Sequence, residues 1–401
     1  MKKVKIHDAI MGSGKTTKAI ANMKKNKGSF LYVTPFLNEV ERILENVPNT
    51  FQPKVTNVKN HLGEWEILHK RNNLLTMANN GKNIVTTHSL FSKLQRSDYS
   101  FFKDYDLILD EVLTPIEVIK ISADDIKIAF KQGLLVKNDK TGEVTYTGDD
   151  YKGFYSALKP YCDTANVVHV NDRLLVWAFP PEIFQSFKSV TVLTYLFEGS
   201  LLASYFKYYK IPYELEKHSD QDEAIMKFKI SKLLNIYEGL SNKWGDHHSA
   251  FCVSWLRNKT SKEFKQIKDT VSNILQRNFA ATSNDTAFTT FKKFESKLKG
   301  KGYSRGFVPV NERATNKYAH KGTMIYLANR FLDPNIIDFF RSGNVKVDEN
   351  NWALAELLQW IWRGAIRNHE EMNLFIPSKR MRTLLSEWLN DTDYKSLSMA
   401  A

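Results

Sequence analysis

The stretch Ala9-Ile10-Met11-Gly12-Ser13-Gly14-Lys15-Thr16-Thr17 lies where a short alternating strand, Lys3 to Ala9, gives way to a helical pattern that begins at Thr17. Gly12 and Gly14 lack the Cβ atoms that would block close approach, so successive backbone N–H groups can surround a phosphate. The following helix directs the positive end of its dipole at the same point. The stretch therefore predicts a phosphate-binding loop, and an ordinary glycine-rich turn is the alternative.

The residue types in this loop match the chemistry of a nucleoside triphosphate. Lys15 would reach the β- and γ-phosphates, and the hydroxyl of Thr16 would bind Mg²⁺. Ala9 departs from the general motif, which has its first glycine there. The residues expected to bind the nucleotide are Gly12, Ser13, Gly14, Lys15, Thr16 and Thr17.

A second element of nucleotide chemistry is the run Leu107-Ile108-Leu109-Asp110-Glu111, an apolar strand that delivers two acids to its carboxyl end. Asp110 would hold the hydrated Mg²⁺, and Glu111 would orient and deprotonate an attacking water. An Asp-Glu pair alone is common, and an acidic turn at a strand end is the alternative. Its place after a phosphate loop favours the catalytic interpretation.

Composition sets the outer limits. The 401 residues suffice for two domains, and 42% hydrophobic with 25% charged residues is typical of a globular protein. No run of eighteen apolar residues and no signal peptide is seen, so a cytoplasmic protein is expected. The two cysteines, Cys162 and Cys252, do not have the spacing of a zinc site. The formal charge of +13 favours a polyanionic partner such as nucleic acid. Much of that charge lies in residues 257–268 and 292–305, which ordinary solvated helix faces would also explain.

Strand and helix patterns alternate along the first half of the chain, as in a mostly parallel sheet. The predicted strands after the first are residues 29–35, 83–87, 105–110 and 189–193, and helices follow from Phe36 and His88. The spacing between Asp110 and Val192 is too long for one strand-helix unit, so an insertion is expected at about residues 113–185. Residues 136–148 within it predict a β-hairpin around Lys140-Thr141-Gly142. This hairpin could separate nucleic-acid strands, and a surface hairpin without such a role is the alternative.

The second half carries the signals of another lobe. Residues 248–255, 278–281 and 306–310 predict strands, and polar residues including Arg313 and Asn316 follow the last of them. Residues 353–368 predict one helix, on which Gln359, Arg363 and Arg367 are spaced i, i+4, i+8 and so share a face. An arginine offered to a γ-phosphate would stabilise the charge of the transition state. An exposed face whose guanidiniums lie over apolar neighbours is the alternative.

The ordered series AIMGSGKTT, YVTPFLNEV, IVTTHSLF, LILDEV, VLTYLFEGS, FVPVNERATN and QWIWRGAIRN resembles the motifs of superfamily 2 helicases, particularly the divergent DEAD-like helicases of bacteriophages. The resemblance implies an α/β protein with two RecA-like P-loop NTPase lobes, residues 1–215 with Walker A and B and residues 216–401 with an arginine-finger helix. It implies ATP in the cleft between them and a nucleic-acid strand across both.

Carried over by position, the resemblance assigns roles to particular residues. Asp110 and Glu111 would be the hydrolytic acids, and Arg363 and Arg367, assisted by Gln359, the finger residues. Two features depart from the family pattern, because Val112-Leu113 follows the acids and the arginines are four residues apart instead of three. Residues expected at the nucleic acid are Thr34, Pro35, Thr87, His88, Ser254, Trp255, Arg313 and Asn316.

These observations favour an ATP-dependent DNA helicase or translocase that uses ATP and Mg²⁺, in phage DNA replication or recombination. The expected partners are single-stranded or forked DNA and replication or recombination proteins. RNA stays open as an alternative to DNA, and no membrane association is expected. A nucleotide-gated DNA-binding module without unwinding activity is the alternative, because a sequence cannot show that turnover occurs.

Overall fold

The computed structural model describes residues 2–59, 65–139, 142–163, 166–217, 220–311 and 317–391. The chain forms two compact units. Unit 1 comprises Met1–Asp8, Gly14–Glu216 and Leu332–Asp348, and unit 2 comprises Ala9–Ser13, Lys217–Phe331 and Glu349–Ala401. The division at residues 215 and 216 that the sequence suggests remains a prediction.

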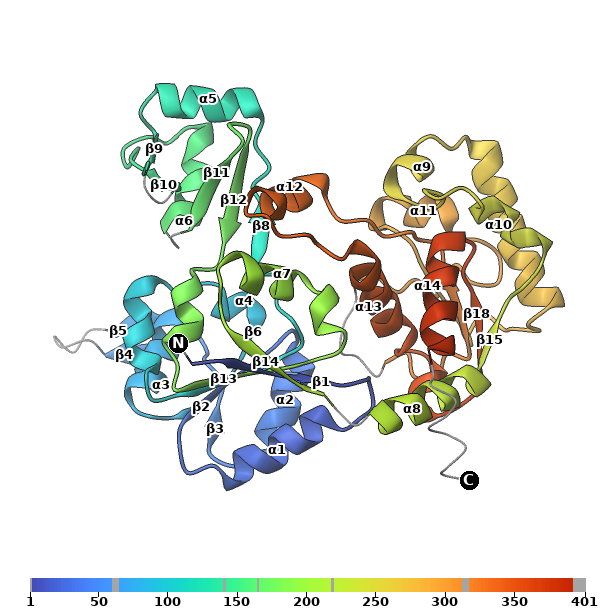
Figure 1. Ribbon diagram of the computed structural model, residues 1–401, viewed down its shortest axis with the longest axis horizontal. Coiled ribbons are helices and arrows are strands. Elements are labelled where there is room, and N and C mark those ends of the chain that lie inside the picture. The colour runs from blue at the N-terminus through green and yellow to red at the C-terminus, as the bar shows by residue number, and fades with distance from the viewer. Residues whose placement is uncertain are drawn as a thin grey trace. The chain divides into compact units, whose positions relative to one another are not determined.

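Unit 1 is built on a seven-stranded sheet of order β14-β1-β13-β7-β2-β6-β3, in which the pairs from β1 to β3 are all parallel (Figure 1). Its strands are β1 (Val4–Asp8), β2 (Phe30–Thr34), β3 (Thr50–Phe51), β6 (Asn83–Thr87), β7 (Asp106–Asp110), β13 (Ser189–Thr194) and β14 (Tyr213–Lys217). Because the strands are parallel, the carboxyl ends of β1, β13, β7, β2 and β6 meet at one edge. This is the predicted arrangement of a RecA-like lobe.

The helices that the sequence predicts after β1, β2 and β6 are present, and unit 1 contains further helices besides them. The α-helices are α1 (Lys15–Lys25), α2 (Leu37–Asn46), α3 (Lys70–Asn79), α4 (His88–Phe91), α5 (Ala123–Lys131), α6 (Lys159–Asp163), α7 (Leu201–Tyr208) and α12 (Pro334–Ser342). The 3₁₀ helices are η1 (Arg96–Phe102), η2 (Phe154–Leu158), η3 (Pro181–Gln185) and η4 (Phe197–Gly199). A two-stranded ribbon, β4 (Thr56–Lys59) and β5 (Trp65–Leu68), lies outside the main sheet.

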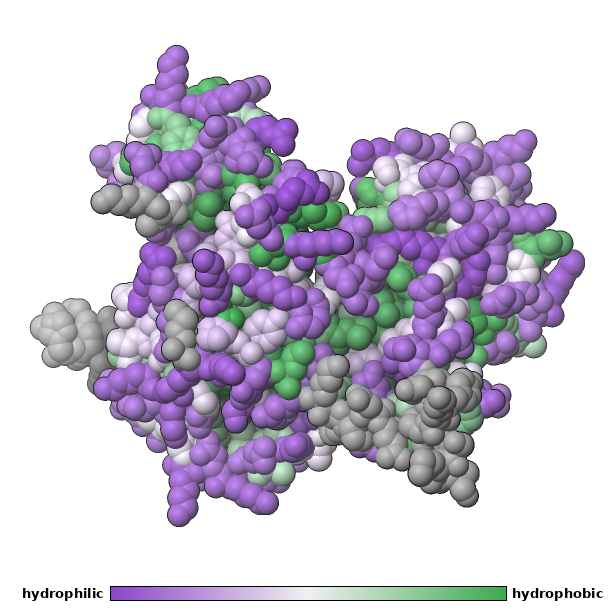
Figure 2. Space-filling view, viewed as in Figure 1, coloured by the Kyte–Doolittle hydropathy of each residue, from purple (hydrophilic) through white to green (hydrophobic). Residues whose placement is uncertain are grey.

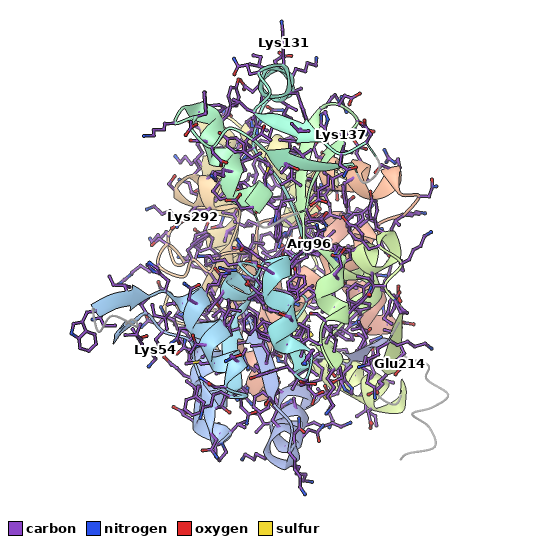
Figure 3. All side chains as sticks on the ribbon, turned by 90° about the vertical axis from the view of Figure 1, so that its left-hand side faces the viewer. Lys54, Arg96, Lys131, Lys137, Glu214 and Lys292 are labelled. Carbon is purple, nitrogen blue, oxygen red and sulfur yellow. The ribbon has the colours of Figure 1, made fainter. Side chains whose placement is uncertain are left out.

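The predicted insertion is present as an antiparallel sheet of order β8-β12-β11-β10-β9. Its strands are β8 (Ile116–Val118), β9 (Leu135–Lys137), β10 (Glu143–Tyr146), β11 (Val167–Val170) and β12 (Leu174–Ala178). Strands β9 and β10 pair as the predicted hairpin, although Lys140 and Thr141 of its turn lie outside the described residues. Lys131 and Lys137 lie at the outer end of the insertion (Figure 3).

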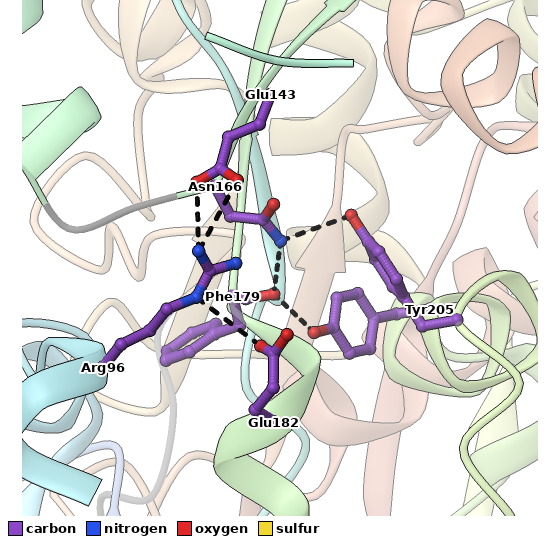
Figure 4. Close-up of polar contacts among 7 residues, drawn as sticks. Arg96, Glu143, Asn166, Phe179, Glu182 and Tyr205 are labelled. Carbon is purple, nitrogen blue, oxygen red and sulfur yellow. Dashed lines mark hydrogen bonds and ion pairs between the residues drawn. The ribbon is translucent and has the colours of Figure 1, made fainter. Parts of the chain in front are cut away.

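Polar contacts hold the insertion to helices of unit 1 (Figure 4). Arg96 of η1 pairs with Glu143 of β10 at 3.1 Å and with Glu182 of η3 at 3.7 Å. Nearby, the amide of Asn166 and the hydroxyl of Tyr205 both donate to the carbonyl of Phe179. The helices η1 and η3, which are far apart in sequence, are thereby fixed beside β10. We therefore regard the insertion as an anchored part of unit 1.

Unit 2 contains a four-stranded parallel sheet of order β15-β18-β17-β16. Its strands are β15 (Leu234–Ile236), β16 (Thr286–Thr289), β17 (Thr323–Tyr326) and β18 (Met372–Phe375). Its helices are α8 (Asp220–Leu233), α9 (Val253–Arg257), α10 (Ser261–Arg277), α11 (Glu295–Leu298), α13 (Glu349–Ile361) and α14 (Lys379–Asn390), with the 3₁₀ helices η5 (Leu240–Gly245), η6 (Lys292–Phe294) and η7 (Ala365–Asn368). The parallel sheet confirms the second RecA-like lobe.

Two predicted strands of unit 2 are wrong. Residues 248–255 form turns and the start of α9, because Phe251 adopts a left-handed backbone (φ 64°) and Cys252 caps the helix by accepting from the N–H of Trp255. Residues 278–281 likewise form no strand, and Ala280 has a positive φ of 46°. Of residues 306–310, Phe307 alone makes a bridge, parallel to Phe288.

Within the described ranges, no helix has the length and apolar character that a membrane span requires.

Candidate nucleotide site

The loop between β1 and α1 has the backbone that its sequence predicts. Gly12 and Gly14 both adopt left-handed conformations, with φ of 81° and 82°. Such angles are strained for residues with a side chain, which explains the two glycines. Gly14 precedes the first turn of α1, and Lys15, Thr16 and Thr17 form that turn. The exposed backbone N–H groups of this turn are the donors that a phosphate needs.

Asp110 lies at the carboxyl end of β7, in the middle of the sheet. It is 8% exposed, and the hydroxyl of Thr34 on neighbouring β2 donates to its Oδ2 across 3.4 Å. The Nε2 atom of His88 lies 3.1 Å from the backbone oxygen of Asp110. The structure therefore brings Asp110 together with two residues that the sequence analysis had placed at the nucleic acid. The burial of Thr34 argues against direct contact with a strand and makes it a support for Asp110.

Burial raises the pKa of Asp110 to about 7, and the negative charge of Glu111 adds to the effect. The positive charge of Lys15 acts in the opposite direction. A carboxyl group in such surroundings is one that a divalent cation would keep ionised. A carboxylate and a hydroxyl are the oxygen ligands that Mg²⁺ prefers, so Asp110 and Thr16 are of the residue types that suit this ion. No group of three or more His, Cys, Asp or Glu side chains suited to a metal occurs in the described part of the chain, so an all-protein cage is not available there.

Glu111 has an unusual backbone. Its φ of 64° is left-handed, and its N–H donates to the carbonyl of Leu193 on β13 across 2.9 Å. A left-handed backbone conformation costs free energy at residues other than glycine, and such residues cluster at functional sites. The neighbouring strand therefore fixes the direction in which the chain leaves β7, and with it the starting point of the Glu111 side chain.

Strand β13 also pairs in parallel with β1, the strand that leads into the phosphate loop. Leu193, Thr194 and Tyr195, which belong to the VLTYLFEGS motif of the helicase resemblance, are all buried. Two residues further on, the N–H of Phe197 donates to Asp8 Oδ2 across 3.1 Å. Sequence reasoning missed Asp8, although an acid at the end of a strand directly before a phosphate loop is a usable signal.

The three polar residues of the C-terminal motif do not share a helical face, so that prediction is wrong. Helix α13 ends at Ile361, and η7 begins at Ala365. Gln359 therefore lies on α13, Arg363 in the intervening turn and Arg367 on η7. The chain then reaches Gly364, whose backbone is extended and which packs tightly: an added Cβ would lie 2.5 Å from Met372 Sδ and 3.0 Å from the Lys321 carbonyl oxygen.

The arginines differ in their surroundings. Arg363 is 3% exposed, whereas Arg367 is half-buried. The N–H of Ala365 donates to the Lys321 carbonyl across 2.9 Å, which fixes the turn that carries Arg363 against the start of β17. Both arginines lie two residues from this anchored position, so they differ in side-chain burial and not in backbone support.

The remaining predicted nucleic-acid residues fall into several settings. Pro35 directly follows β2, and Thr87 caps α4 by accepting from the N–H of Leu90. Ser254 and Trp255 lie on α9, where the Trp255 ring stacks on Phe251 with centroids 4.9 Å apart. Arg313 and Asn316 lie outside the described residues.

The two parallel sheets, the loop between β1 and α1 and the antiparallel insertion together define an α/β protein with RecA-like lobes and an XPD-like fold. S. tokodaii Xpd4 matches with a TM-score of 0.50 at 12% identity, over 98% of this chain and 95% of that chain. An apo structure of XPD matches with a TM-score of 0.50 at 14% identity, over 99% of this chain and 95% of that chain. At these identities the likeness concerns the fold.

Sequence comparison gives the family. The models of the YonV middle domain and the YonV C-terminal Rossmann-like domain match residues 116–177 and 228–389. The SPbeta prophage-derived uncharacterized protein YonV of Bacillus subtilis (strain 168) is 37% identical over 417 residues, which cover 98% of this chain and 100% of that protein. The chain belongs to the YonV family. The match to the middle domain covers nearly the same residues as the insertion sheet.

Proposed function

We propose that this protein is an ATP-dependent DNA helicase or translocase, which couples ATP hydrolysis to movement along a nucleic-acid strand. The observation that carries the proposal is the placement of the Gly14–Thr17 turn and Asp110 at one edge of one parallel sheet. A nucleotide bound by the first would present its phosphates to the second. The XPD-like fold and the net charge of +13 support nucleic acid as the partner.

In this proposal each residue near the phosphates has one task. Gly12, Ser13, Gly14 and Thr17 cradle the phosphates, and Lys15 neutralises the β- and γ-phosphate charge. Thr16 and Asp110 hold Mg²⁺, which supplies charge neutralisation at the phosphate oxygens. Glu111 orients the attacking water and takes its proton. Arg363, Arg367 and Gln359 stabilise the charge that develops on the transferred phosphoryl group.

The nucleic-acid contacts in this proposal are Pro35, Thr87, His88, Ser254 and Trp255. They follow sheet strands or begin short helices, where backbone N–H groups and hydroxyls can contact phosphates. Thr34 is omitted, because its side chain is buried against Asp110. The prophage-derived relative agrees with a role in phage DNA replication or recombination.

Strand displacement from a duplex with a single-stranded tail tests this proposal. Wild-type protein should separate the strands with ATP and not with a non-hydrolysable analogue, and Lys15→Ala should separate none while still binding DNA. The second candidate is a nucleotide-gated DNA-binding module. The net charge of +13, which attracts DNA whatever its base sequence, supports this candidate equally well. Nucleotide-dependent DNA binding without displacement or movement would favour that module.

A further inference from the structure

Cationic side chains are concentrated in one segment of unit 2. Residues 257–305 contain twelve Lys and Arg but four Asp and Glu, which makes a net charge of +8 out of the +13 of the whole chain. The segment spans α9, α10, η6 and α11. Repulsion among so many like charges works against the compact state unless a polyanion neutralises them.

These cations have few acidic partners. In the described part of the chain, Lys259 pairs with Glu263 at 2.7 Å and Lys292 with Glu295 at 2.6 Å, and the other ten cations of the segment make no ion pair. Unit 1 differs, because several of its cations are paired, such as Arg71 with Asp98 and Arg96 with Glu143. The unpaired charges of residues 257–305 are therefore available to an external anion.

The charges lie along one side of α10. Its buried positions include Phe264, Ile267 and Val271, so Lys262, Lys265 and Lys268 lie on one flank, together with one acid, Asp269. The loop after β16 runs along the same flank. Lys297 Nζ lies 5.4 Å from the centre of the Phe264 ring, and the hydroxyl of Ser272, one turn beyond Lys268, donates to the Lys301 carbonyl across 2.9 Å.

We propose that this surface, formed by Lys262, Lys265, Lys268, Lys297 and Lys301 and called here the α10 track, binds the phosphate backbone of a nucleic acid without reading its sequence. The proposal rests on the proposed function and names one of its contact surfaces. From Lys262 to Ser272, which holds the Lys301 carbonyl, α10 rises about 15 Å, which matches roughly four successive phosphates of a DNA strand.

The surface chemistry favours nucleic acid over a membrane or a protein partner. In the part of the chain that the structure describes, none of the exposed large hydrophobic side chains falls within residues 257–305. Hydrophilic residues predominate on the visible face over α9 and α10 in Figure 2, and Lys292 of η6 projects outward in Figure 3. Membrane insertion and protein hot spots both need apolar anchors, whereas phosphate contacts need lysine ammonium groups.

The backbone beneath the track is fixed before any ligand arrives. Thr260 and Glu263 form a capping box at the start of α10, and Phe264, Ile267 and Val271 are buried in the core of unit 2. The ammonium groups therefore project from a rigid support, and their long stems supply the remaining adjustment.

A triple variant, Lys262→Gln, Lys265→Gln and Lys297→Gln, tests the track, with Lys24→Gln, Lys27→Gln and Lys131→Gln of unit 1 as a control of equal charge. Binding of a labelled single-stranded oligonucleotide and of a blunt duplex is measured by fluorescence anisotropy from 50 to about 200 mM salt. We expect the track variant to lose at least about tenfold in affinity. Its log–log salt slope should fall by about 2 for the single strand and about 3 for the duplex.

The same residues changed to Arg should restore binding, because a phosphate contact needs the charge. ATP hydrolysis without DNA should be unchanged in both variants. Unchanged affinity and salt slope in the Gln variant, or equal losses in the unit 1 control, would overturn the α10 track. DNA-stimulated hydrolysis would then still support the motor, so failure of the track and failure of the proposed function are distinguishable. Loss with the duplex alone, or with the single strand alone, identifies the form that the track holds.

Discussion

Thr34 Oγ1 lies 3.4 Å from Asp110 Oδ2, which joins the carboxyl ends of β2 and β7 beneath the candidate nucleotide site. The contact is buried, and His88 approaches the backbone oxygen of the same Asp110. Residues from two other sequence blocks thus contact Asp110, Thr34 at the carboxylate and His88 at the backbone oxygen. We interpret Thr34 as a group that positions the Asp110 carboxylate, and the ionisation of that carboxylate can be measured.

Asp110→Asn should change how stability depends on pH. The folded-state pKa of about 7 exceeds the unfolded value of roughly 3.9, so between these values the folded state holds the extra proton. Asp110 therefore lowers the free energy of unfolding as pH rises from about 4 to 7, by up to about 4 kcal/mol. The nucleotide-free Asn variant should exceed wild type in stability at pH 8, and urea unfolding should show that difference vanishing near pH 4. A difference that is independent of pH would contradict the account.

Glu111→Gln should slow turnover strongly while nucleotide still binds. Loss of the group that takes the proton from water should lower the rate of ATP hydrolysis by roughly 10²–10⁴-fold. Glu111→Gly separates chemistry from backbone strain, because glycine accepts the φ of 64°. That variant should be equally inactive yet more stable by about 1 kcal/mol, as thermal unfolding would show. Activity retained in both variants would exclude Glu111 as the base.

Arg363→Ala should lower turnover far more than nucleotide affinity. A group that stabilises the charge of the transition state raises the rate of hydrolysis more than it strengthens nucleotide binding. Its loss should therefore lower the rate on the order of 10³-fold. Arg367→Ala is the matched comparison, since its side chain is half-buried and lies on η7. Steady-state rates and nucleotide titrations of both variants would identify the finger. Equal losses in rate and affinity for Arg363→Ala would argue against this role.

Gly364→Ala should destabilise the turn that carries Arg363. The added Cβ would meet Met372 Sδ at 2.5 Å and a backbone oxygen at 3.0 Å, which predicts a loss of about 1–3 kcal/mol. Gly28→Ala is a suitable control, because its nearest neighbour would lie 3.4 Å away. Chemical denaturation of both variants checks the difference. A Gly364→Ala variant as stable as Gly28→Ala would mean that the turn has room to relax.

The features that the sequence predicted correctly depend on local patterns. The strand, glycine-rich loop and helix from Val4 to Lys25, and the apolar strand ending at Asp110, are set by residues close together in the chain. The errors depend on tertiary contacts. The turn after α13 leads to Gly364, which packs against Met372 and Lys321 from other parts of the chain. Residues 248–255 have the composition of a strand but form turns through the left-handed Phe251. The short buried strands β16 and β17 gave no recognisable pattern of their own.

The rate of ATP hydrolysis with and without single-stranded DNA tests the central claim most directly. Wild-type protein should hydrolyse ATP with Mg²⁺, single-stranded DNA should raise the rate at least severalfold, and Lys15→Ala should reduce it to background under both conditions. A wild-type rate that DNA does not change, or wild-type turnover by Lys15→Ala, would contradict a nucleic-acid motor driven from this site.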